Sequence, residues 1–353
     1  MTHARRSCEA MMERLDPLSD PRWAQFVDRV PGALIFHHPA WLRLVCGQYG
    51  YPVSAWVMMT PDGDVAAGLP VALLRSRLTG TRLIALPFSE TCPPLIDPAS
   101  GIEPVEFARY LDHERTARGL TLQVRAGLPA GQGAVVTKTF LNHRLPLEPD
   151  VAAVEARFAK GQVKRGIAKA RREGVSIEPR TDSEGLRRFF RLHVRTRRRQ
   201  GLPTQPKRFI LRFVELFALG LGFVLIARQN DQDVAATVFL SNRGTLTYEF
   251  GASDPRYLGS RPNNLLFMEA IRWGCEAGYH TLDFGRTDPA NHGLRAFKMS
   301  WGAEESPLHY SQFGSPVAGN GDGRLRQAMN VIIPRAPALF GRLVGSGLYR
   351  HFG

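Results

Sequence analysis

The sequence carries one short pattern twice, once in each half. Asp62-Gly-Asp-Val-Ala-Ala67 recurs as Asp231-Gln-Asp-Val-Ala-Ala236. Each copy lies between two apolar runs, and a turn rich in Asp and Gly between such runs is typical of a β-hairpin. A third strand-like run follows each copy after a Gly-containing turn, at residues 81–89 and 245–253. Because the flanking runs match in register as well, we interpret the chain as a duplication of one α/β module.

The second copy predicts the element order β-α-α-β-β-β-α-β. The expected elements are a strand at 175–179, helices at 184–199 and 206–219, strands at 223–229, 234–241 and 245–251, a helix from about 262 to 277, a strand at 280–284, a short helix and a strand near 308–313. The first half gives a similar series, with helices at 39–49 and near 104–118 around three strands and a strand at 120–125. We therefore predict an α/β (α+β) fold with a mixed sheet in each half. The expected domains are 1–150, 151–315 and a basic tail at 316–353.

Positive charge is concentrated in one segment. Residues 157–212 hold 18 Lys/Arg and 4 Asp/Glu, whereas the remainder holds 28 of each sign, so this segment accounts for the net charge of +14. Such a block attracts phosphate-bearing partners, namely nucleic acid, anionic lipid or a nucleotide-linked substrate, unless it is only a solvated helix face. A non-catalytic nucleic-acid-binding protein is therefore the competing hypothesis. The run Arg195–Arg199 favours it, but no recognised DNA-binding motif is present.

Several classes of protein are disfavoured. The first residues lack the apolar stretch of an export signal, and the longest apolar run, Leu216–Ala227, is shorter than the roughly 20 residues that span a bilayer, so we expect a cytoplasmic protein. The cysteines are far apart and the histidines lack ligand spacing, so we expect no metal site. Cys46 and Cys275 lie in apolar helical patterns and are expected to be buried. The tail is either an amphipathic helix on the anionic inner membrane surface or a segment that packs across the two lobes.

Five further motifs carry a family resemblance. They are Phe36-His-His-Pro-Ala-Trp41, Lys164-Arg-Gly-Ile-Ala-Lys-Ala170, Arg261-Pro-Asn-Asn264, Leu282-Asp-Phe-Gly-Arg286 and Gly293-Leu-Arg-Ala-Phe-Lys298. In this order and spacing the sequence resembles the FemA/FemB/FemX family of double-GNAT aminoacyltransferases, and the FemAB-like acetyltransferase branch in particular. The element order above is that of a GNAT module.

The resemblance implies roles for particular residues. Lys298 is similar to a lysine that stabilises the transition state, and Lys164, Arg165 and Lys169 to a segment that holds substrate phosphates. The other expectations form two groups. The donor is expected to lie against Gly259, Arg261, Asn263, Asn264 and Phe297, and the acceptor against Tyr248 and Trp41. The donor is an acyl-CoA or an aminoacyl-tRNA used as a co-substrate, with no tightly bound cofactor.

Acyl transfer to an amine needs a neutral amine, a held carbonyl and a stabilised oxyanion. Lys298 or Arg286 can supply the cation. Asp283, at the end of a central strand, either accepts the amine proton or orients the amine, or it caps the following turn. Glu249 is a second candidate base, and strand alternation predicts that it faces away from Tyr248.

The sequence thus predicts an N-acyltransferase that acts on an amine of a cell-envelope, peptidoglycan or polysaccharide precursor. The expected partners are a phosphate-bearing small molecule or a lipid-linked substrate, tRNA if it is the donor, and the inner membrane surface if the tail contacts it. The oligomeric state does not follow from the sequence.

Overall fold

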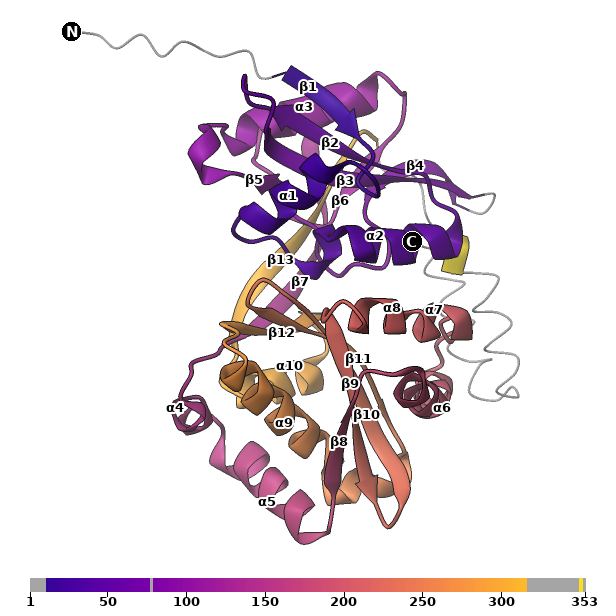
Figure 1. The fold of residues 1–353 in the computed structure, drawn as a ribbon, viewed down its shortest axis with the longest axis vertical. Coiled ribbons are helices and arrows are strands. Elements are labelled where there is room, and N and C mark those ends of the chain that lie inside the picture. Colours follow the sequence, from indigo (N-terminus) through magenta and orange to yellow (C-terminus); the bar gives the residue numbers. More distant parts are fainter. Residues whose placement is uncertain (1–10, 77–78, 316–348, 352–353) are drawn as a thin grey trace, which may run out of the picture. The chain divides into compact units, whose positions relative to one another are not determined.

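The computed structural model describes residues 11–76, 79–315 and 349–351. They form two compact units (Figure 1). Unit 1 comprises the described residues up to Lys138 together with residues 309–315, and unit 2 comprises Thr139–Leu308 and the turn at 349–351. The predicted tail at 316–353 lies almost wholly outside the described residues. The domain limits predicted along the sequence stay a prediction.

Unit 1 is built on one mixed sheet with the strand order β1-β2-β3-β4-β6-β13. The strands are β1 (Met11–Leu15), β2 (Val53–Met59), β3 (Val65–Ser76), β4 (Gly80–Ala85), β6 (Leu122–Val124) and β13 (Glu304–Phe313), with the short β5 (Leu95–Ile96) beside β3. The helices are α1 (Pro21–Arg29), α2 (Pro39–Tyr49) and α3 (Pro104–Thr116). Only β4 and β6 are parallel among these neighbours.

Unit 2 repeats this arrangement with the strand order β8-β9-β10-β11-β12-β7. The strands are β7 (Ala134–Pro146), β8 (Ser176–Arg180), β9 (Gly222–Gln229), β10 (Gln232–Asn242), β11 (Thr245–Ser253) and β12 (Thr281–Thr287). The helices are α4 (Val151–Ala156), α5 (Arg165–Arg172), α6 (Ser183–Arg199), α7 (Lys207–Leu211), α8 (Phe213–Phe217), α9 (Pro262–Glu276) and α10 (His292–Ser300). Here β11 and β12 form the parallel pair.

The two units are equivalent strand by strand, which confirms the tandem fold that the repeat predicted. The repeated hexapeptides lie in the β2–β3 and β9–β10 hairpins, which are at the same place in each order. The last strands are exchanged, because β7 follows β6 in the sequence but pairs with β12, and β13 follows β12 but pairs with β6. Each sheet is thus completed by a strand from the other half of the sequence.

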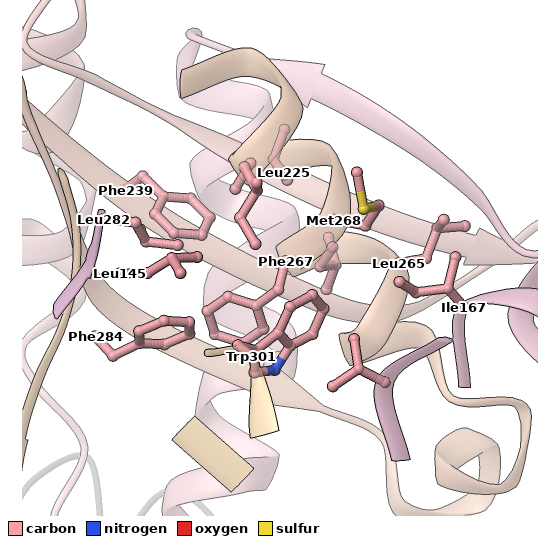
Figure 2. Close-up of a cluster of buried hydrophobic side chains, with 14 of the residues drawn as sticks. Leu145, Ile167, Leu225, Phe239, Leu265, Phe267, Met268, Leu282, Phe284 and Trp301 are labelled. Carbon is pink, nitrogen blue, oxygen red and sulfur yellow. The ribbon is translucent and has the colours of Figure 1, made fainter. Parts of the chain in front are cut away.

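The core of unit 2 lies between the sheet and α9 (Figure 2). Phe267 of α9 packs against Phe284 of β12 and against Trp301, with ring centroids 5.2 Å and 5.7 Å apart. α9 begins at Pro262, whose missing N–H costs nothing in the first turn of a helix. α6 covers the opposite face of the sheet (Figure 1), where Phe189 packs against Phe250 of β11. Apolar side chains on both faces hold β11 and β12 in place, and these strands carry the candidate site.

The predicted element series differs from the structure in both units, and the series for unit 1 lacked β1 and α1. The single helix expected at 206–219 is two short helices, α7 and α8, which meet at Arg212. β7 was not predicted, because its first half is exposed and shows no alternation of apolar and polar residues. Phe209, Phe213 and Phe217 are nevertheless buried. Their spacing therefore predicted the buried face correctly but did not predict the break between α7 and α8.

Candidate functional site

β11 and β12 separate part of the way along unit 2. Their parallel pairing covers Thr245–Thr247 of β11 and ends at the pair Thr247–Asp283. Beyond it β11 continues to Ser253 beside β10, and β12 continues to Thr287 beside β7. Two parallel strands that part in mid-sheet expose backbone groups along both inner edges.

Glu249 lies at a β-bulge in β11, next to this point of separation. Val238 of β10 pairs with Phe250 and Phe239 pairs with Tyr248, so Glu249 is the extra residue on its strand. Bulges re-aim side chains and are frequent beside active sites. The half-buried Glu249 side chain is thus carried by a strand whose regular ladder is interrupted at that residue.

The same bulge overturns the alternation argument for Tyr248 and Glu249. Tyr248 packs on the α9 side, 5.0 Å from the ring of Phe267, whereas Phe250 packs on the α6 side, 5.9 Å from Phe213. Residues two apart on a regular strand face the same way, so the extra residue has reversed the register. The prediction that Tyr248 and Glu249 face opposite sides therefore loses its basis.

A second bulge lies in β12 at Phe284-Gly285. Asp283 pairs with Arg144 and Arg286 with Asn142, so β12 has one residue more than β7 over this stretch. Gly285 has φ 70°, a left-handed conformation that glycine adopts without the steric cost of a Cβ. The segment Asp283-Phe-Gly-Arg286 is thus the local sequence of a bulge.

Asp283 caps this bulge. One carboxylate oxygen accepts the Gly285 N–H at 2.7 Å. The other accepts from Asn142 Nδ2 at 3.4 Å and from Arg144 Nε at 3.2 Å. The side chain is almost fully buried, and these contacts correspond to the turn-capping alternative considered for Asp283.

Lys298 of α10 binds the backbone of the same segment. Its Nζ donates to the carbonyl oxygens of Gly285 at 2.7 Å and Arg286 at 3.1 Å. The residue is only 2% exposed, so it is a buried cation of α10 and not the surface or half-buried lysine considered from the sequence. The Arg286 guanidinium lies over the ring of Phe140, 4.7 Å from its centroid.

The N-terminus of α9 holds three of the predicted donor residues. Arg261 is the N-cap residue, is exposed and has φ 59°, which is unusual for a residue other than glycine. Asn263 is half-buried in the first turn, and Gly259 is exposed in the preceding 310 helix (Pro255–Ser260). The first turn of α9 has no acidic residue and no side-chain cap. The Asn264 N–H donates to the Arg261 carbonyl at 3.0 Å, and the positive end of the helix dipole attracts anions here.

Asp254 fixes the loop before this helix. It accepts from Arg256 at 2.7 Å and from Arg195 of α6 at 3.2 Å. The hydrogen bond from Arg256 lowers the pKa of Asp254 to about 2. The carboxylate is therefore ionised throughout the neutral range and ties the loop to α6.

α5 brings the predicted phosphate-binding residues to the same end of α9. Asn264 Nδ2 donates to the carbonyl oxygen of Gln162 at 3.3 Å, and a Cβ on Gly166 would lie 2.7 Å from that Nδ2 atom. Only glycine permits this approach. Lys164 and Arg165 are exposed beside the contact. Basic residues that lie about a hundred positions earlier in the sequence are therefore next to the N-terminus of α9.

Lys169 differs from its neighbours, because it is paired with Glu173 at 3.5 Å. The two remaining predicted residues lie elsewhere. Phe297 packs against Phe267 with centroids 5.6 Å apart, beside Lys298 in α10. Trp41 is in unit 1, fully buried, with its indole N–H donating to Ser89 at 3.0 Å.

The basic segment divides into two kinds of charge. The arginines of α6 are largely bonded within the protein: Arg188 to Asp233 and Glu178, Arg195 to Asp254, Arg197 to Pro203 and Tyr349, and Arg199 to Ser253. By contrast, Lys160, Lys164, Arg165, Arg171 and Arg172 have no ion pair among the described residues. The phosphate-attracting charge is thus on α5 and the turn before it, and most of the run that favoured nucleic-acid binding is engaged elsewhere.

Sequence reasoning missed three buried polar residues near Lys298. His143 and Asn142 of β7 and Thr287 of β12 are buried beside the β12 bulge. Asn142 and His143 belong to a strand that was not predicted, and Thr287 lies beyond the predicted end of β12. The polar pattern Asn142-His-Arg144 was the available signal.

Three global expectations can be compared with the described chain. Cys46, Cys92 and Cys275 are buried, and burial raises the pKa of Cys46 and Cys92 to about 12, so these thiols are inert. No cluster of three or more His, Cys, Asp or Glu side chains suited to a metal was found in residues 11–76, 79–315 and 349–351. Within the same residues, no helix is long and apolar enough to span a membrane.

Comparison with known proteins identifies a domain and a fold. Residues 157–299 match the family model of the acetyltransferase (GNAT) domain. The fold is similar to FemX, with a TM-score of 0.67 at 14% identity over 90% of this chain and all of that one. The chain thus contains a GNAT acetyltransferase domain and has a FemX-like tandem fold, as the motifs indicated.

Two further solved structures share the fold. One is the C-terminal domain of a putative lysylphosphatidylglycerol synthetase from Agrobacterium fabrum, with a TM-score of 0.53 at 14% identity over 89% of this chain and 95% of that one. The other is L-PGS from Bacillus licheniformis, with a TM-score of 0.54 at 13% identity over 91% of this chain and 98% of that one. No curated protein matches the sequence.

Proposed function

We propose that unit 2 transfers an acetyl, acyl or aminoacyl group from a phosphate-bearing donor to an amine of a cell-envelope precursor. The acceptor class is a peptidoglycan, polysaccharide or lipid-linked precursor. The donor is an acyl-CoA or an aminoacyl-tRNA, which share an activated carbonyl and phosphates. The names of the similar structures, FemX and lysylphosphatidylglycerol synthetase, support an envelope acceptor.

A difference between the two equivalent helix ends carries this proposal. α3 of unit 1 corresponds to α9 of unit 2, but its first turn contains Glu106, which accepts the N–H of Glu103 at 3.0 Å. A carboxylate there repels phosphate. The first turn of α9 has neither an acid nor a side-chain cap, and it lies beside the basic α5. These facts support donor binding in unit 2.

The ends of the equivalent parallel strands also differ between the units, and this difference again supports donor binding in unit 2. In unit 1 the segment after β4 bonds to the end of β6, because the N–H of Cys92 and the hydroxyl of Thr91 both donate to the Arg125 carbonyl at 3.1 Å. In unit 2 the equivalent strands β11 and β12 extend past their last pair, and both bulges occur there. The inner edges of these strands, which no longer pair with each other, suit a donor carbonyl laid between them.

In the proposed reaction the amine nitrogen attacks the donor carbonyl carbon. A C–N bond forms, the C–S bond of a thioester or the C–O bond of an aminoacyl ester breaks, and the thiolate or alkoxide leaves. Glu249 accepts the amine proton. Lys298 places a buried positive charge at the β12 bulge, where it stabilises developing negative charge. Asp283 holds the bulge in shape, Tyr248 lines the acceptor side and Arg286 lies beside it.

Donor binding is tested by isothermal titration calorimetry with coenzyme A and, separately, with deacylated tRNA. The variant Lys164→Glu/Arg165→Glu reverses two exposed charges on the α5 side. Its control, Lys207→Glu/Arg208→Glu, reverses an equally exposed Lys-Arg pair on α7, which likewise has no ion pair among the described residues.

We expect the first variant to weaken binding of the true donor at least tenfold and the control to change it less than twofold. Equal losses would indicate a general charge effect and would contradict the assigned site. Mass spectrometry of the co-purifying ligand then distinguishes the donors, because it recovers either coenzyme A or tRNA.

A further inference from the structure

His143 lies at the centre of a buried polar chain in unit 2. It is on β7, and its side chain is fully buried. Its Nε2 lies 3.1 Å from a carboxylate oxygen of Glu305, and its Nδ1 lies 3.3 Å from the Thr287 hydroxyl. A buried imidazole with both nitrogens engaged has a fixed ring orientation.

The partners define the tautomer. An ionised carboxylate only accepts hydrogen bonds, so Nε2 carries the proton and donates it to Glu305. In the neutral ring Nδ1 is then an acceptor, and the Thr287 hydroxyl donates to it. Arg295 keeps Glu305 ionised, because its hydrogen bonds to that carboxylate lower the pKa of Glu305.

This chain of contacts closes on Lys298. Arg295 of α10 binds both oxygens of Glu305, at 2.5 Å and 2.7 Å. Lys298 follows one turn later in the same helix and donates to the Arg286 carbonyl of β12. Thr287 is the next residue of β12. The ring of contacts therefore joins α10 to β12 twice, once through Lys298 and once through the chain of Arg295, Glu305, His143 and Thr287.

We propose that neutral His143 is a positioning residue that clamps α10, through Glu305 and Arg295, so that Lys298 stays on the carbonyls of the β12 bulge. The proposal rests on the proposed role of this site in acyl transfer. His143 touches no substrate in this scheme and acts only through Lys298.

The neutral state of the ring follows from its surroundings. The charged or titratable groups that face His143 are Glu305 of β13 and Arg295 and Lys298 of α10. Burial, followed by the charge of Lys298, lowers the pKa of His143 below its ordinary value of 6.5. The ring is therefore neutral at pH 7, with Nε2 as the donor to Glu305 and Nδ1 as the acceptor from Thr287.

Hydrogen–deuterium exchange of the full chain tests the clamp without a substrate. We expect His143→Ala to speed exchange of the α10 amides at least tenfold, while His143→Gln, which keeps a donor for Glu305, stays within about threefold of the wild type. His193→Ala is the control, because that buried histidine belongs to α6.

Unchanged α10 exchange in His143→Ala, or equal effects of His143→Ala and His193→Ala on α10, would overturn the proposal. The exchange result holds even if unit 2 transfers no acyl group, so the two proposals fail separately. Where transfer is measured, His143→Gln should keep kcat within about threefold of the wild type, and His143→Ala should lose more activity than that. An alanine variant as active as the glutamine variant would likewise contradict the clamp.

Discussion

Replacing Lys298 by methionine tests the role of its buried ammonium. Methionine keeps most of the side-chain length but removes the donor to the carbonyls of Gly285 and Arg286. The Gly285 carbonyl belongs to a bulge that has left the regular ladder with β7, so no strand neighbour replaces its lost bond, whereas Arg286 rejoins the ladder opposite Asn142.

The magnitude follows from two opposed effects. A buried acceptor left without its partner costs about 1–3 kcal/mol, so two carbonyls cost about 2–6 kcal/mol. Removing a buried charge recovers part of the several kcal/mol spent on its desolvation. We expect the cost of the unpaired carbonyls to exceed the recovered desolvation free energy by about 2 kcal/mol, because the ammonium is already solvated by the carbonyls that it binds. For a unit of this size that corresponds to a fall in Tm of about 4–8 °C.

Thermal unfolding followed by circular dichroism measures this change, with Lys207→Met as the control for loss of an exposed lysine. The control should remain within about 0.5 kcal/mol of the wild type. A Lys298→Met protein as stable as the wild type would refute the structural part of the argument. If it were also inactive, Lys298 would act on the substrate alone; if it were fully active, the lysine would have no role in the site.

Three further outcomes follow from the structure. Glu249→Gln should lower kcat about 10²–10⁴-fold, the range of general-base catalysis, and leave donor affinity unchanged by calorimetry; unaltered turnover would exclude Glu249 as the base. Gly166→Ala should cost about 1–3 kcal/mol by overpacking against Asn264, measured by urea unfolding, whereas Gly161→Ala meets only the flexible end of an arginine at 3.3 Å and should be neutral. Burial lowers the pKa of His37 to about 4, so stability should fall by about 3 kcal/mol between pH 6.5 and 4 as the unfolded chain takes up the proton; a pH profile of His37→Gln that matches the wild type would contradict this.

The sequence by itself determined the tandem architecture. The repeated hexapeptide marks the same hairpin in both units, because hairpin turns have strong local requirements that survive in the sequence. Alternation and helical periods likewise gave the strands around β10 and the helix α9, since each of these elements buries one regular face. The motif Asp283-Phe-Gly-Arg286 marked the right strand, because a cap and a left-handed glycine are local features of a bulge.

Only the tertiary structure decided how the site is assembled. The bulge at Glu249 depends on the pairing of β11 with β10, and it cannot be predicted from Tyr248 and Glu249 alone. The burial of Lys298 depends on where α10 packs, and its partners are backbone atoms, which have no sequence signature.

The exchange of β7 and β13 and the approach of α5 to Asn264 are contacts between segments about a hundred or more residues apart. Local propensity carries no information about such contacts, because their free energy comes from the assembled core. The motifs therefore indicated which module is the candidate for the chemistry, and the packing of that module determined which polar groups meet at the two bulges.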